Sequence, residues 1–197
     1  MSSSTVRRAT VERATKETRV RIELDLDGSG SANADTALPF FDHMLQQLGT
    51  HAGFDLAVSA KGDLEVDGHH TVEDVGLALG QALREALGDK RGIRRFASIT
   101  VPLDEAAVEV ALDLSGRPFV VHEVPMPAEL IGTYDTGLTE DFVRAFATAG
   151  EFTLHVRLVS GRSPHHIVEA EFKAIAKCLQ DAVRIVGADV PSTKGSL

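Results

Sequence analysis

The sequence predicts an α+β fold in which one unit of three strands, a helix, a strand and a helix occurs twice. Two observations lead to this prediction. A strand-like phrase at residues 20–28 returns at 108–116, and the pattern His-His-x-x-Glu at 69–73 returns at 165–169. Because the apolar face of each sheet must be covered by helices, the helix layers should be sandwiched between two four-stranded sheets.

The first copy can be followed element by element. Residues 20–28 alternate apolar and polar side chains, which is typical of a strand with one buried face. A short apolar helix is expected at 40–48 with Gly53 as its stop signal, and a strand at 54–60. The long helix expected at 71–87 carries apolar residues at helical spacing: Val72, Val75, Leu79 and Leu83.

The second copy repeats this order, with a helix expected at 139–147 before Gly150, a strand at 152–160 and a long helix at 167–186. The shift between copies is 88 residues at the strand (108 minus 20) and 96 at the histidine pairs (165 minus 69). The second copy therefore contains a net insertion, which we expect within residues 125–137.

Each half is too small to be expected as an independent domain, so we predict one compact unit, residues 1–197, with an internal pseudo-twofold axis. Residues 7–92 form the first repeat and residues 93–188 the second. Residues 189–197 form a C-terminal tail that is expected to bind substrate.

Composition limits the class of protein. Hydrophobic residues make up 43% and charged residues 25%, as in ordinary soluble proteins, and no apolar run is long enough to span a membrane. Residues 1–10 lack the apolar core of a secretory signal, and the one cysteine, Cys178, is expected to be a buried thiol, so we expect a cytoplasmic protein. A net charge of -9 argues against nucleic-acid binding.

The duplicated histidine motif indicates metal binding. On a helix, His69 and Glu73 lie on one face, whereas the adjacent His69 and His70 point about 100° apart, which favours two ions over one ion shared by the pair. Imidazole and carboxylate without thiolate suit manganese, zinc, iron or nickel. The alternative is that each pair only caps a helix, but duplication of the whole pattern favours metal.

Four further histidines lie outside the two pairs. His43 and His155 would complete eight potential ligands, four for each of two ions; alone, each would be read as a core histidine. His51 fits either a helix-end contact or a substrate contact. His122 has no partner in the sequence and is expected at the surface.

A second group of residues that indicates function is basic. Residues 88–95 form a cation-rich turn in an acidic protein, Arg117 follows a Ser-Gly turn, and residues 191–195 combine Ser192, Thr193 and Lys194. Guanidinium groups and hydroxyls are what a phosphate ester requires, although solvated surface charge explains most single Lys and Arg residues. A small phosphorylated substrate is therefore predicted.

Six phrases in order resemble the imidazoleglycerol-phosphate dehydratase family, from about Arg8 to Leu197. They are residues 40–45, 69–74, 88–96, 113–118, 164–170 and 191–195. The resemblance implies halves related to the second domain of ribosomal protein S5. It also implies a homo-oligomer of 24 subunits built from trimers, with two Mn²⁺ ions per active site at subunit boundaries.

The resemblance also implies residue roles. One ion would take His43, His70, Glu73 and His165, and the other would take His69, His155, His166 and Glu169. The substrate phosphate would be held by Arg95, Arg117, Ser192 and Lys194. Thr193 is also expected to bind substrate, and other substrate contacts would come from Glu17 and His51. One departure is that residues 139–142 lack a histidine that the family often carries there.

The implied reaction is dehydration of D-erythro-imidazole-glycerol phosphate to imidazole-acetol phosphate in histidine biosynthesis, through an imidazolate and a diazafulvene-type intermediate held by two manganese ions. Glu17, Glu73 and Glu169 are candidate acid–base groups, and Glu17 is favoured because metal binding lowers carboxylate basicity. Two alternatives stay open. A two-metal phosphate-ester hydrolase lacks its usual Asp-rich ligands, and a metal-storage protein leaves the basic residues unexplained.

Overall fold

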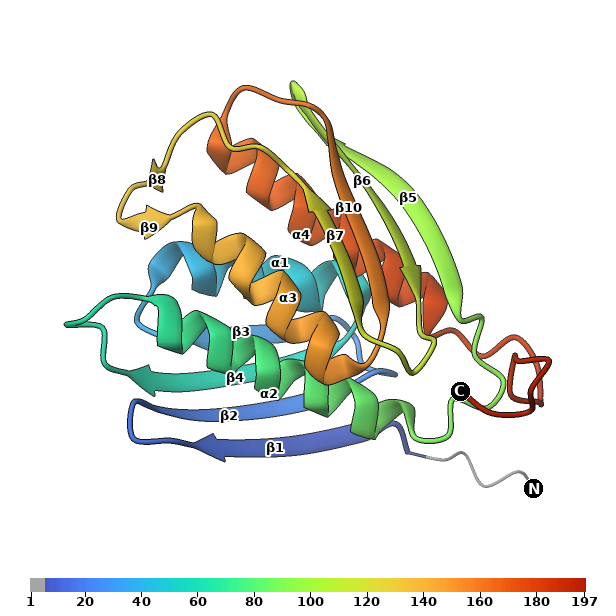
Figure 1. Ribbon diagram of the computed structural model, residues 1–197. Coiled ribbons are helices and arrows are strands. Elements are labelled where there is room, and N and C mark those ends of the chain that lie inside the picture. Colours follow the sequence, from blue (N-terminus) through green and yellow to red (C-terminus); the bar gives the residue numbers. More distant parts are fainter. Residues whose placement is uncertain (1–5) are drawn as a thin grey trace.

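Two four-stranded sheets form the outer layers of the molecule, and four helices fill the space between them (Figure 1). This computed structural model describes residues 6–197. The expectation that residues 1–10 are not a secretory signal falls in part on residues 1–5, outside the described range. The predicted sheet–helix–sheet layering is confirmed.

The two halves have the same element order and the same sheet topology. The first half contains β1 (Arg8–Ala14), β2 (Thr18–Asp25), β3 (Ala32–Asp35), α1 (Pro39–Ala52), β4 (Asp55–Gly62) and α2 (His69–Leu87). The second contains β5 (Phe96–Leu103), β6 (Ala106–Asp113), β7 (Phe119–Glu123), α3 (Gly137–Gly150), β10 (Thr153–Ser160) and α4 (Pro164–Ala182). The sheet orders are β1-β2-β4-β3 and β5-β6-β10-β7, with β3 parallel to β4 and β7 parallel to β10. The internal duplication is thereby confirmed.

The insertion in the second half is a small hairpin between β7 and α3. Its strands are β8 (Leu130–Ile131) and β9 (Tyr134–Asp135), inside the stretch where the sequence placed it. Before the hairpin, counterparts in the two halves are 88 positions apart, as are the first residues of β2 and β6. After it, the first residues of α1 and α3 are 98 apart. These shifts identify counterpart residues below.

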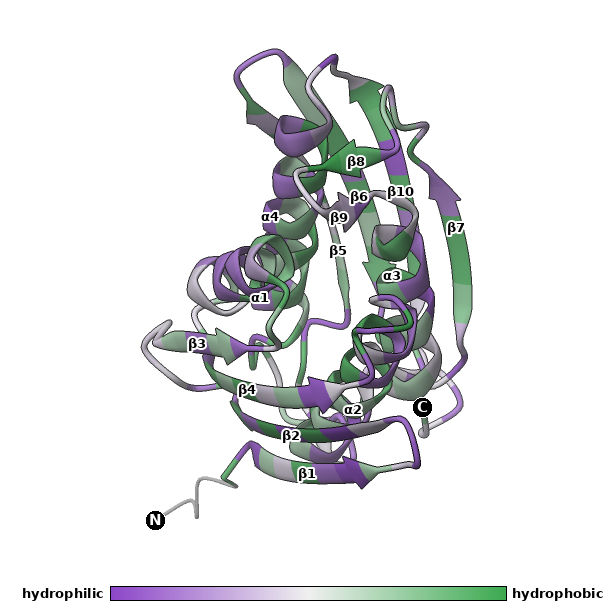
Figure 2. Cartoon of the chain, turned by 90° about the vertical axis from the view of Figure 1, so that its left-hand side faces the viewer, coloured by the Kyte–Doolittle hydropathy of each residue, from purple (hydrophilic) through white to green (hydrophobic). Residues whose placement is uncertain are grey.

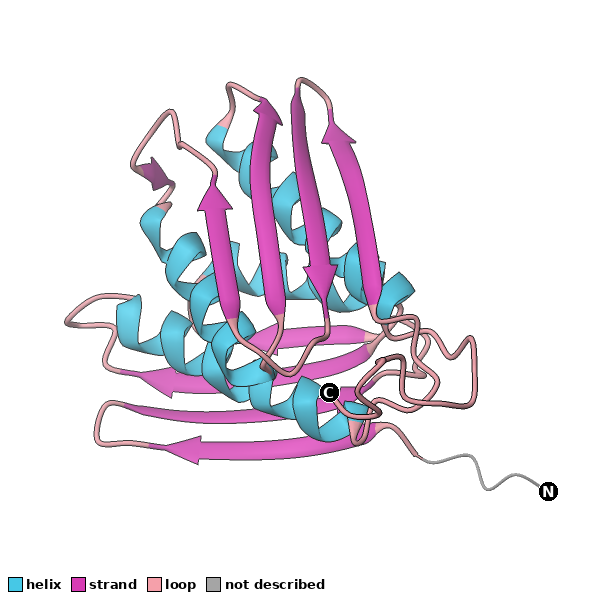
Figure 3. Ribbon diagram, turned by 45° about the vertical axis from the view of Figure 1, so that its right-hand side comes forward, coloured by secondary structure: helices cyan, strands magenta, loops and turns pink. Residues whose placement is uncertain are grey.

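The core extends across both halves. Strand β2 buries every second residue, and the apolar faces of the sheets and helices meet in the interior (Figure 2). Helix α1 packs on α4, and α2 packs on α3, so each helix pair joins one half to the other (Figure 3). Phe142 at the centre contacts the rings of Phe41, Phe146 and Phe172 at centroid distances of 5.4, 5.8 and 5.2 Å. The halves therefore share one hydrophobic core.

Two helix ends differ from the sequence-based expectation. Gly53 follows α1 in the left-handed conformation (φ 73°) as expected, but Gly150 is the last residue of α3 and Glu151 takes that conformation (φ 53°). Helix α4 was expected to reach residue 186 and ends at Ala182. It ends there because the following residues pair with the basic turn, where the backbone N–H of Arg95 donates to Ala182 O at 2.9 Å.

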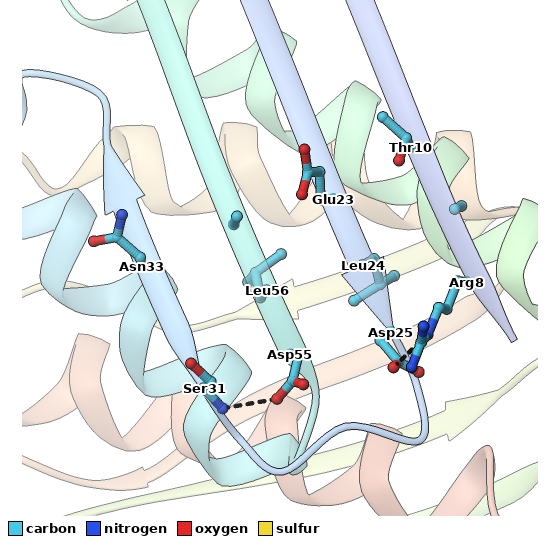
Figure 4. Close-up of a pocket in the computed structure, with 11 residues that line it drawn as sticks. Arg8, Thr10, Glu23, Leu24, Asp25, Ser31, Asn33, Asp55 and Leu56 are labelled. Carbon is cyan, nitrogen blue, oxygen red and sulfur yellow. Dashed lines mark hydrogen bonds and ion pairs between the residues drawn. The ribbon is translucent and has the colours of Figure 1, made fainter.

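Three further features concern the helices, the one cysteine and a surface pocket outside the candidate site. Within residues 6–197, every helix is too short or too polar to cross a membrane. Cys178 is buried, as expected, and burial raises its pKa to about 12. A shallow polar pocket lies at the first sheet, where Asp55 accepts a hydrogen bond from Ser31 (Figure 4). It is lined by no residue that the sequence nominated for the active site.

Candidate active site

All four helices begin at one end of the molecule, on the left of Figure 1. The two histidine pairs lie in the first turns of α2 and α4. Helix α4 starts there because Pro164 suits the first turn and the Ser163 hydroxyl accepts a hydrogen bond from the backbone N–H of His166. Both helices begin at this end, so all four paired histidines lie there.

His43, His165 and Glu169 form one compact group, called here the His43 cluster. Nε2 of His43 lies 3.5 Å and Nε2 of His165 lies 3.0 Å from Oε2 of Glu169. All three potential ligand atoms lie within 4.8 Å of one another. Two imidazoles and one carboxylate form a donor set that fits a first-row divalent ion, and the cluster joins α1 of one half to α4 of the other.

The lowered pKa of Glu169 suits the binding of a divalent ion by the His43 cluster. Burial alone would raise its pKa, but hydrogen bonds from Lys173 and His165 outweigh burial and hold the pKa below its ordinary value. Nζ of Lys173 lies 2.6 Å from Oε1, the carboxylate oxygen that does not contact the histidines. Glu169 is therefore held as an oriented carboxylate anion.

The counterpart group joins α2 to α3 and consists of His69, Glu73 and Asp141, called here the His69 cluster. Nε2 of His69 lies 3.7 Å from Glu73, and Nδ1 lies 3.1 Å from Asp141. Asp141 is the counterpart of His43, 98 positions later. The two clusters thus occupy equivalent places but differ in chemistry, since the second has one imidazole and two carboxylates.

The second histidine of each pair points away from these clusters toward another carboxylate. Nδ1 of His70 lies 3.0 Å from Asp63, and Nδ1 of His166 lies 2.7 Å from Glu105. These hydrogen bonds raise the pKa of both histidines, and the one from His166 lowers the pKa of Glu105 to about 2. Anchoring Nδ1 by a carboxylate fixes the ring and leaves Nε2 to ligate a metal.

Glu17 lies beside this group. Its carboxylate is 4.0 Å from Nδ1 of His70, in the turn between β1 and β2. Glu105, 88 positions later, occupies the equivalent turn next to His166. Glu17 therefore lies at the histidine end of the chain.

The grouping within one chain differs from the partition implied by the resemblance. His43 meets His165 as expected, but the carboxylate between them is Glu169 rather than Glu73. His70 contacts neither His43 nor His165 within ion-pairing or ring-stacking range in the described chain.

His155 lies apart from the other nominated ligands. It is on β10 between the buried residues Leu154 and Val156, so its ring is on the outer face of the sheet. It lines a surface pocket together with Asp181, near the end of α4 opposite to His165.

His51 lies in the last turn of α1 and contacts Gln47 at 2.9 Å. Burial lowers its pKa, and the nearby charges of Lys173 and Lys177 lower it further. It is thus a half-buried imidazole on the side of α1 that faces α4.

The expectation that His122 lies at the surface without a partner is wrong. Its side chain is 4% exposed, and Nε2 lies 2.9 Å from Glu171, which is completely buried. The reason is strand alternation, because His122 shares the inward face of β7 with Val120. Burial alone would lower the pKa of His122, but the hydrogen bond to Glu171 outweighs it and the net pKa is raised.

The nominated phosphate-binding residues meet at the opposite end of the molecule. Arg95, Arg117, Ser192, Thr193 and Lys194 all line one hollow. Arg95 donates to both carboxylate oxygens of Asp113, at 2.7 and 3.1 Å, and to the carbonyl of Pro191 at 2.7 Å. The tail is therefore held over the basic turn by the same guanidinium that the sequence nominated for phosphate.

The two ends are far apart within one chain. Helix α4 begins with the His165 pair and ends at Ala182, whose carbonyl contacts the backbone of Arg95. Its 19 residues span about 27 Å. No small ligand can contact both ends of a single chain at once.

Sequence reasoning missed three carboxylates at the histidine end: Asp63, Glu105 and Asp141. A signal existed for Glu105, because shifting Glu17 by the 88 positions found in the sequence gives it. The shift of 98 that relates His43 to Asp141 follows from the helix bounds in the structure. Asp63 follows β4, and the sequence carries no comparable signal for its contact with His70.

The fold and its two ends define an internally duplicated α+β protein whose His43 cluster could hold a divalent ion, the arrangement of a metal-dependent enzyme. Comparison with known proteins gives the family. A sequence profile described as imidazoleglycerol-phosphate dehydratase matches residues 36–179. The chain belongs to this family of hydro-lyases.

Relatives agree over almost the whole chain. The imidazoleglycerol-phosphate dehydratase of Acidothermus cellulolyticus is 59% identical over 97% of this chain and 93% of its own length, and that of Paracoccus denitrificans is 53% identical over 98% and 100%. The crystal structure of the Staphylococcus aureus enzyme, 32% identical, covers 90% of this chain and 99% of its own, with a TM-score of 0.82. The Pyrococcus furiosus structure, 34% identical, covers 95% and 100%, also with a TM-score of 0.82.

Proposed function

We propose that the protein dehydrates D-erythro-imidazole-glycerol phosphate to imidazole-acetol phosphate in histidine biosynthesis. The observation that carries the proposal is the presence, in a chain of this family, of two histidine–carboxylate clusters at one end and a cationic hollow at the other. The clusters suit an imidazole ring bound through metal ions, and the hollow suits the phosphate.

The chemical difficulty is expelling hydroxide from a carbon that has no neighbouring carbonyl. Two Mn²⁺ ions, when bound, would supply Lewis acidity and favour the imidazolate form of the substrate ring, which can lose hydroxide to give a diazafulvene-type species. The proposed ligands of this chain are His43, His165 and Glu169 for one ion and His69, Glu73 and Asp141 for the other, with His70 and His166 as further ligands. Within one chain His155 lies beside Asp181 at the other end, so its proposed role as a ligand requires that a neighbouring subunit brings it to the ions.

Glu17 is proposed to carry the proton from the carbon next to the ring. Glu73 and Glu169 are weaker bases once they bind metal, because the positive ion lowers their proton affinity. Glu17 lies 4.0 Å from His70 and makes no closer ion pair among residues 6–197. It is therefore adjacent to the proposed ligands and still free to accept a proton.

The active site is proposed to lie between subunits of a homo-oligomer, as the resemblance implies for a 24-subunit shell built from trimers. The support is the separation of about 27 Å along α4, which an imidazole ring with a three-carbon phosphate chain cannot span. The outward-turned His70 and His166 would complete the clusters of a neighbouring copy. We also propose a cytoplasmic location, which suits a biosynthetic enzyme with one buried cysteine.

The decisive experiment is an assay of metal-stripped protein with and without added Mn²⁺. Formation of imidazole-acetol phosphate only in the presence of metal would support the proposal. Absence of product with Mn²⁺, Zn²⁺, Fe²⁺ and Ni²⁺ in turn would refute it. Release of inorganic phosphate without dehydration would instead favour a phosphate-ester hydrolase.

A further inference from the structure

Asp74 is a buried carboxylate that is not among the ligands and bases proposed above. It lies in α2 one turn after His70, and its exposed fraction is 6%. Each of its oxygens accepts a hydrogen bond from one of the strands β1 and β2. Nε of Arg13 donates to Oδ1 at 2.7 Å, and the hydroxyl of Thr18 donates to Oδ2. One carboxylate therefore joins α2 to both strands that flank the β1–β2 turn.

This turn carries Glu17, the proposed acid–base group. The hydroxyl of Thr15 accepts hydrogen bonds from the backbone N–H of Glu17 at 3.1 Å and from that of Thr18 at 3.0 Å. The hydroxyls of Thr15 and Thr18 lie 3.3 Å apart, and Thr18 is bound to Asp74. The backbone on both sides of Glu17 is thus connected to Asp74 without any contact from the carboxylate of Glu17.

The second half of the chain builds the same turn without these polar side chains. The counterparts of Arg13, Thr15, Thr18 and Asp74, at shifts of 88 and 96 positions, are Val101, Leu103, Ala106 and Ala170. All four are apolar, and the two alanines are buried. Since the strands, the turn and the long helix form there with apolar residues, the fold alone does not require a charged network at this place.

The two turns differ in what their glutamate does. Glu105 lies 2.7 Å from Nδ1 of His166, so this carboxylate itself attaches its turn to α4. Glu17 lies 4.0 Å from Nδ1 of His70, beyond the distance of a hydrogen bond, and its side chain is 54% exposed. Asp74 supplies in the first half the attachment that Glu105 supplies in the second.

We propose that Asp74 is a positioning residue for Glu17. By holding Arg13 and Thr18, it fixes the turn so that the carboxylate of Glu17 has no structural task and can face the substrate. The inference rests on the proposed acid–base role of Glu17. A carboxylate that served only the fold would affect turnover no more than an equally destabilising change elsewhere.

The test is a double-mutant cycle of Asp74→Asn and Glu17→Gln in the full-length assembled protein with Mn²⁺. Asp74→Asn keeps the size of the side chain and removes the charge that pairs with Arg13. It should lower kcat at least about tenfold, but by less than the roughly 100-fold expected for Glu17→Gln, because misplacing a group cannot cost more than removing it. In the Glu17→Gln background it should lower kcat less than about twofold further, with KM and metal content unchanged.

Asp55→Asn is the matched control. Asp55 also holds a turn of the first sheet, through the backbone N–H groups of Ser29 and Ser31 at 2.8 and 3.0 Å, but at the end of β4 remote from Glu17. It should lower the urea midpoint and change kcat less than about twofold. If Asp74→Asn does not fold, Thr18→Val, which keeps the size and removes the hydroxyl donor, supplies the same comparison.

Hydrogen exchange tests the position of the turn without the substrate assay. Asp74→Asn should speed amide exchange in residues 15–18 at least about tenfold and leave residues 103–106 unchanged, because the network holds only the first turn. If the wild type forms no imidazole-acetol phosphate, the proposed function fails, and exchange alone decides: faster exchange at 15–18 supports the inference and unchanged exchange overturns it.

With an active wild type, kinetics decide. If Glu17→Gln is slow while Asp74→Asn keeps the wild-type kcat, or if the two losses are additive in the cycle, this inference fails alone. If Glu17→Gln keeps full turnover, the acid–base role of Glu17 fails and the inference fails with it.

Discussion

Replacing Gly80 with alanine tests how the two halves are held in register. Gly80 lies in α2 where this helix crosses α3, and a Cβ placed there would lie 2.7 Å from the backbone N of Gly150 and 2.9 Å from Cβ of Ala149. It would also press on the carbonyl oxygen of Phe146. These atoms are mainly backbone, so relief requires α2 and α3 to move apart by about 0.7 Å or more.

The magnitude follows from two opposing effects. Alanine improves helix propensity by about 1 kcal/mol, while overpacking a close helix contact costs about 1–3 kcal/mol. Because the obstacles to Gly80→Ala are rigid, we expect a net loss of about 1–2 kcal/mol, or about 3–6 °C in Tm for a chain of this size. The contact between His69 and Asp141 lies between the same two helices, so metal affinity at the His69 cluster should fall as well.

Thermal and urea unfolding measure the stability of Gly80→Ala, and metal titration measures its affinity for ions. Gly187→Ala is the control, because a Cβ there meets no atom within 4 Å. If Gly80→Ala is more stable than the wild type, helix propensity dominates and the close-packing argument is refuted.

Four further predictions concern the active site and the first sheet. Glu17→Gln should reduce turnover by about 100-fold, the lower range for a general base, and leave metal content unchanged. Purified protein should contain about two ions per chain, and His70→Ala should lower this number. Asp141→His should make the His69 cluster equivalent to the His43 cluster and increase its affinity for zinc relative to manganese, since imidazole suits zinc and carboxylate suits manganese. Asp55→Asn should lower the urea midpoint at neutral pH, because hydrogen bonds from Ser29 and Ser31 hold the pKa of Asp55 below its ordinary 3.8.

Each of these predictions has an outcome that contradicts it. Equal turnover in Glu17→Gln would remove its proposed role, and one ion per chain that is unchanged in His70→Ala would refute the two-metal site. Asp141→His with unaltered metal preference would exclude Asp141 as a ligand. Because the pKa of Asp55 is lower in the folded protein than its ordinary value, the ionised carboxylate stabilises the fold above pH 3.8, and this stabilisation is lost as the pH falls through the pKa of the folded protein. The difference in urea midpoint between the wild type and Asp55→Asn must therefore shrink in acid below pH 3.8. A difference that stays constant with pH would contradict the prediction.

The element order, layering and insertion could be predicted because each rests on local periodicity or on repetition along the chain. Apolar residues recur at every second position in the strand that contains Ile22 and at helical spacing in the helix that contains Val75, so each pattern predicts one type of element. The alternation of the apolar Leu154 and Val156 with His155 likewise predicts that the ring of His155 lies on the outer face of the sheet.

Other features of the site depend on how distant segments pack, which periodicity does not encode. The pairing of Glu169 with His43 results from α1 packing on α4 across the two halves. The burial of His122 depends on Glu171 lying opposite it in the core. The contact of Arg95 with the tail at Pro191 joins residues 96 positions apart, and no local pattern predicts it.

The common direction of the four helices gives the chain an electrical polarity. Each helix carries a dipole of roughly half a positive charge at its N-terminal end and half a negative charge at its C-terminal end. The carboxylates of Asp63, Glu105 and Asp141 gather at the positive ends, and the cations of the basic turn and tail gather at the negative ends. The side chains oppose the field of the backbone at both ends. In the proposed homo-oligomer, the acidic end of one copy would attract the basic end of another, and this head-to-tail orientation would bring a phosphate hollow to a neighbour's proposed metal ligands.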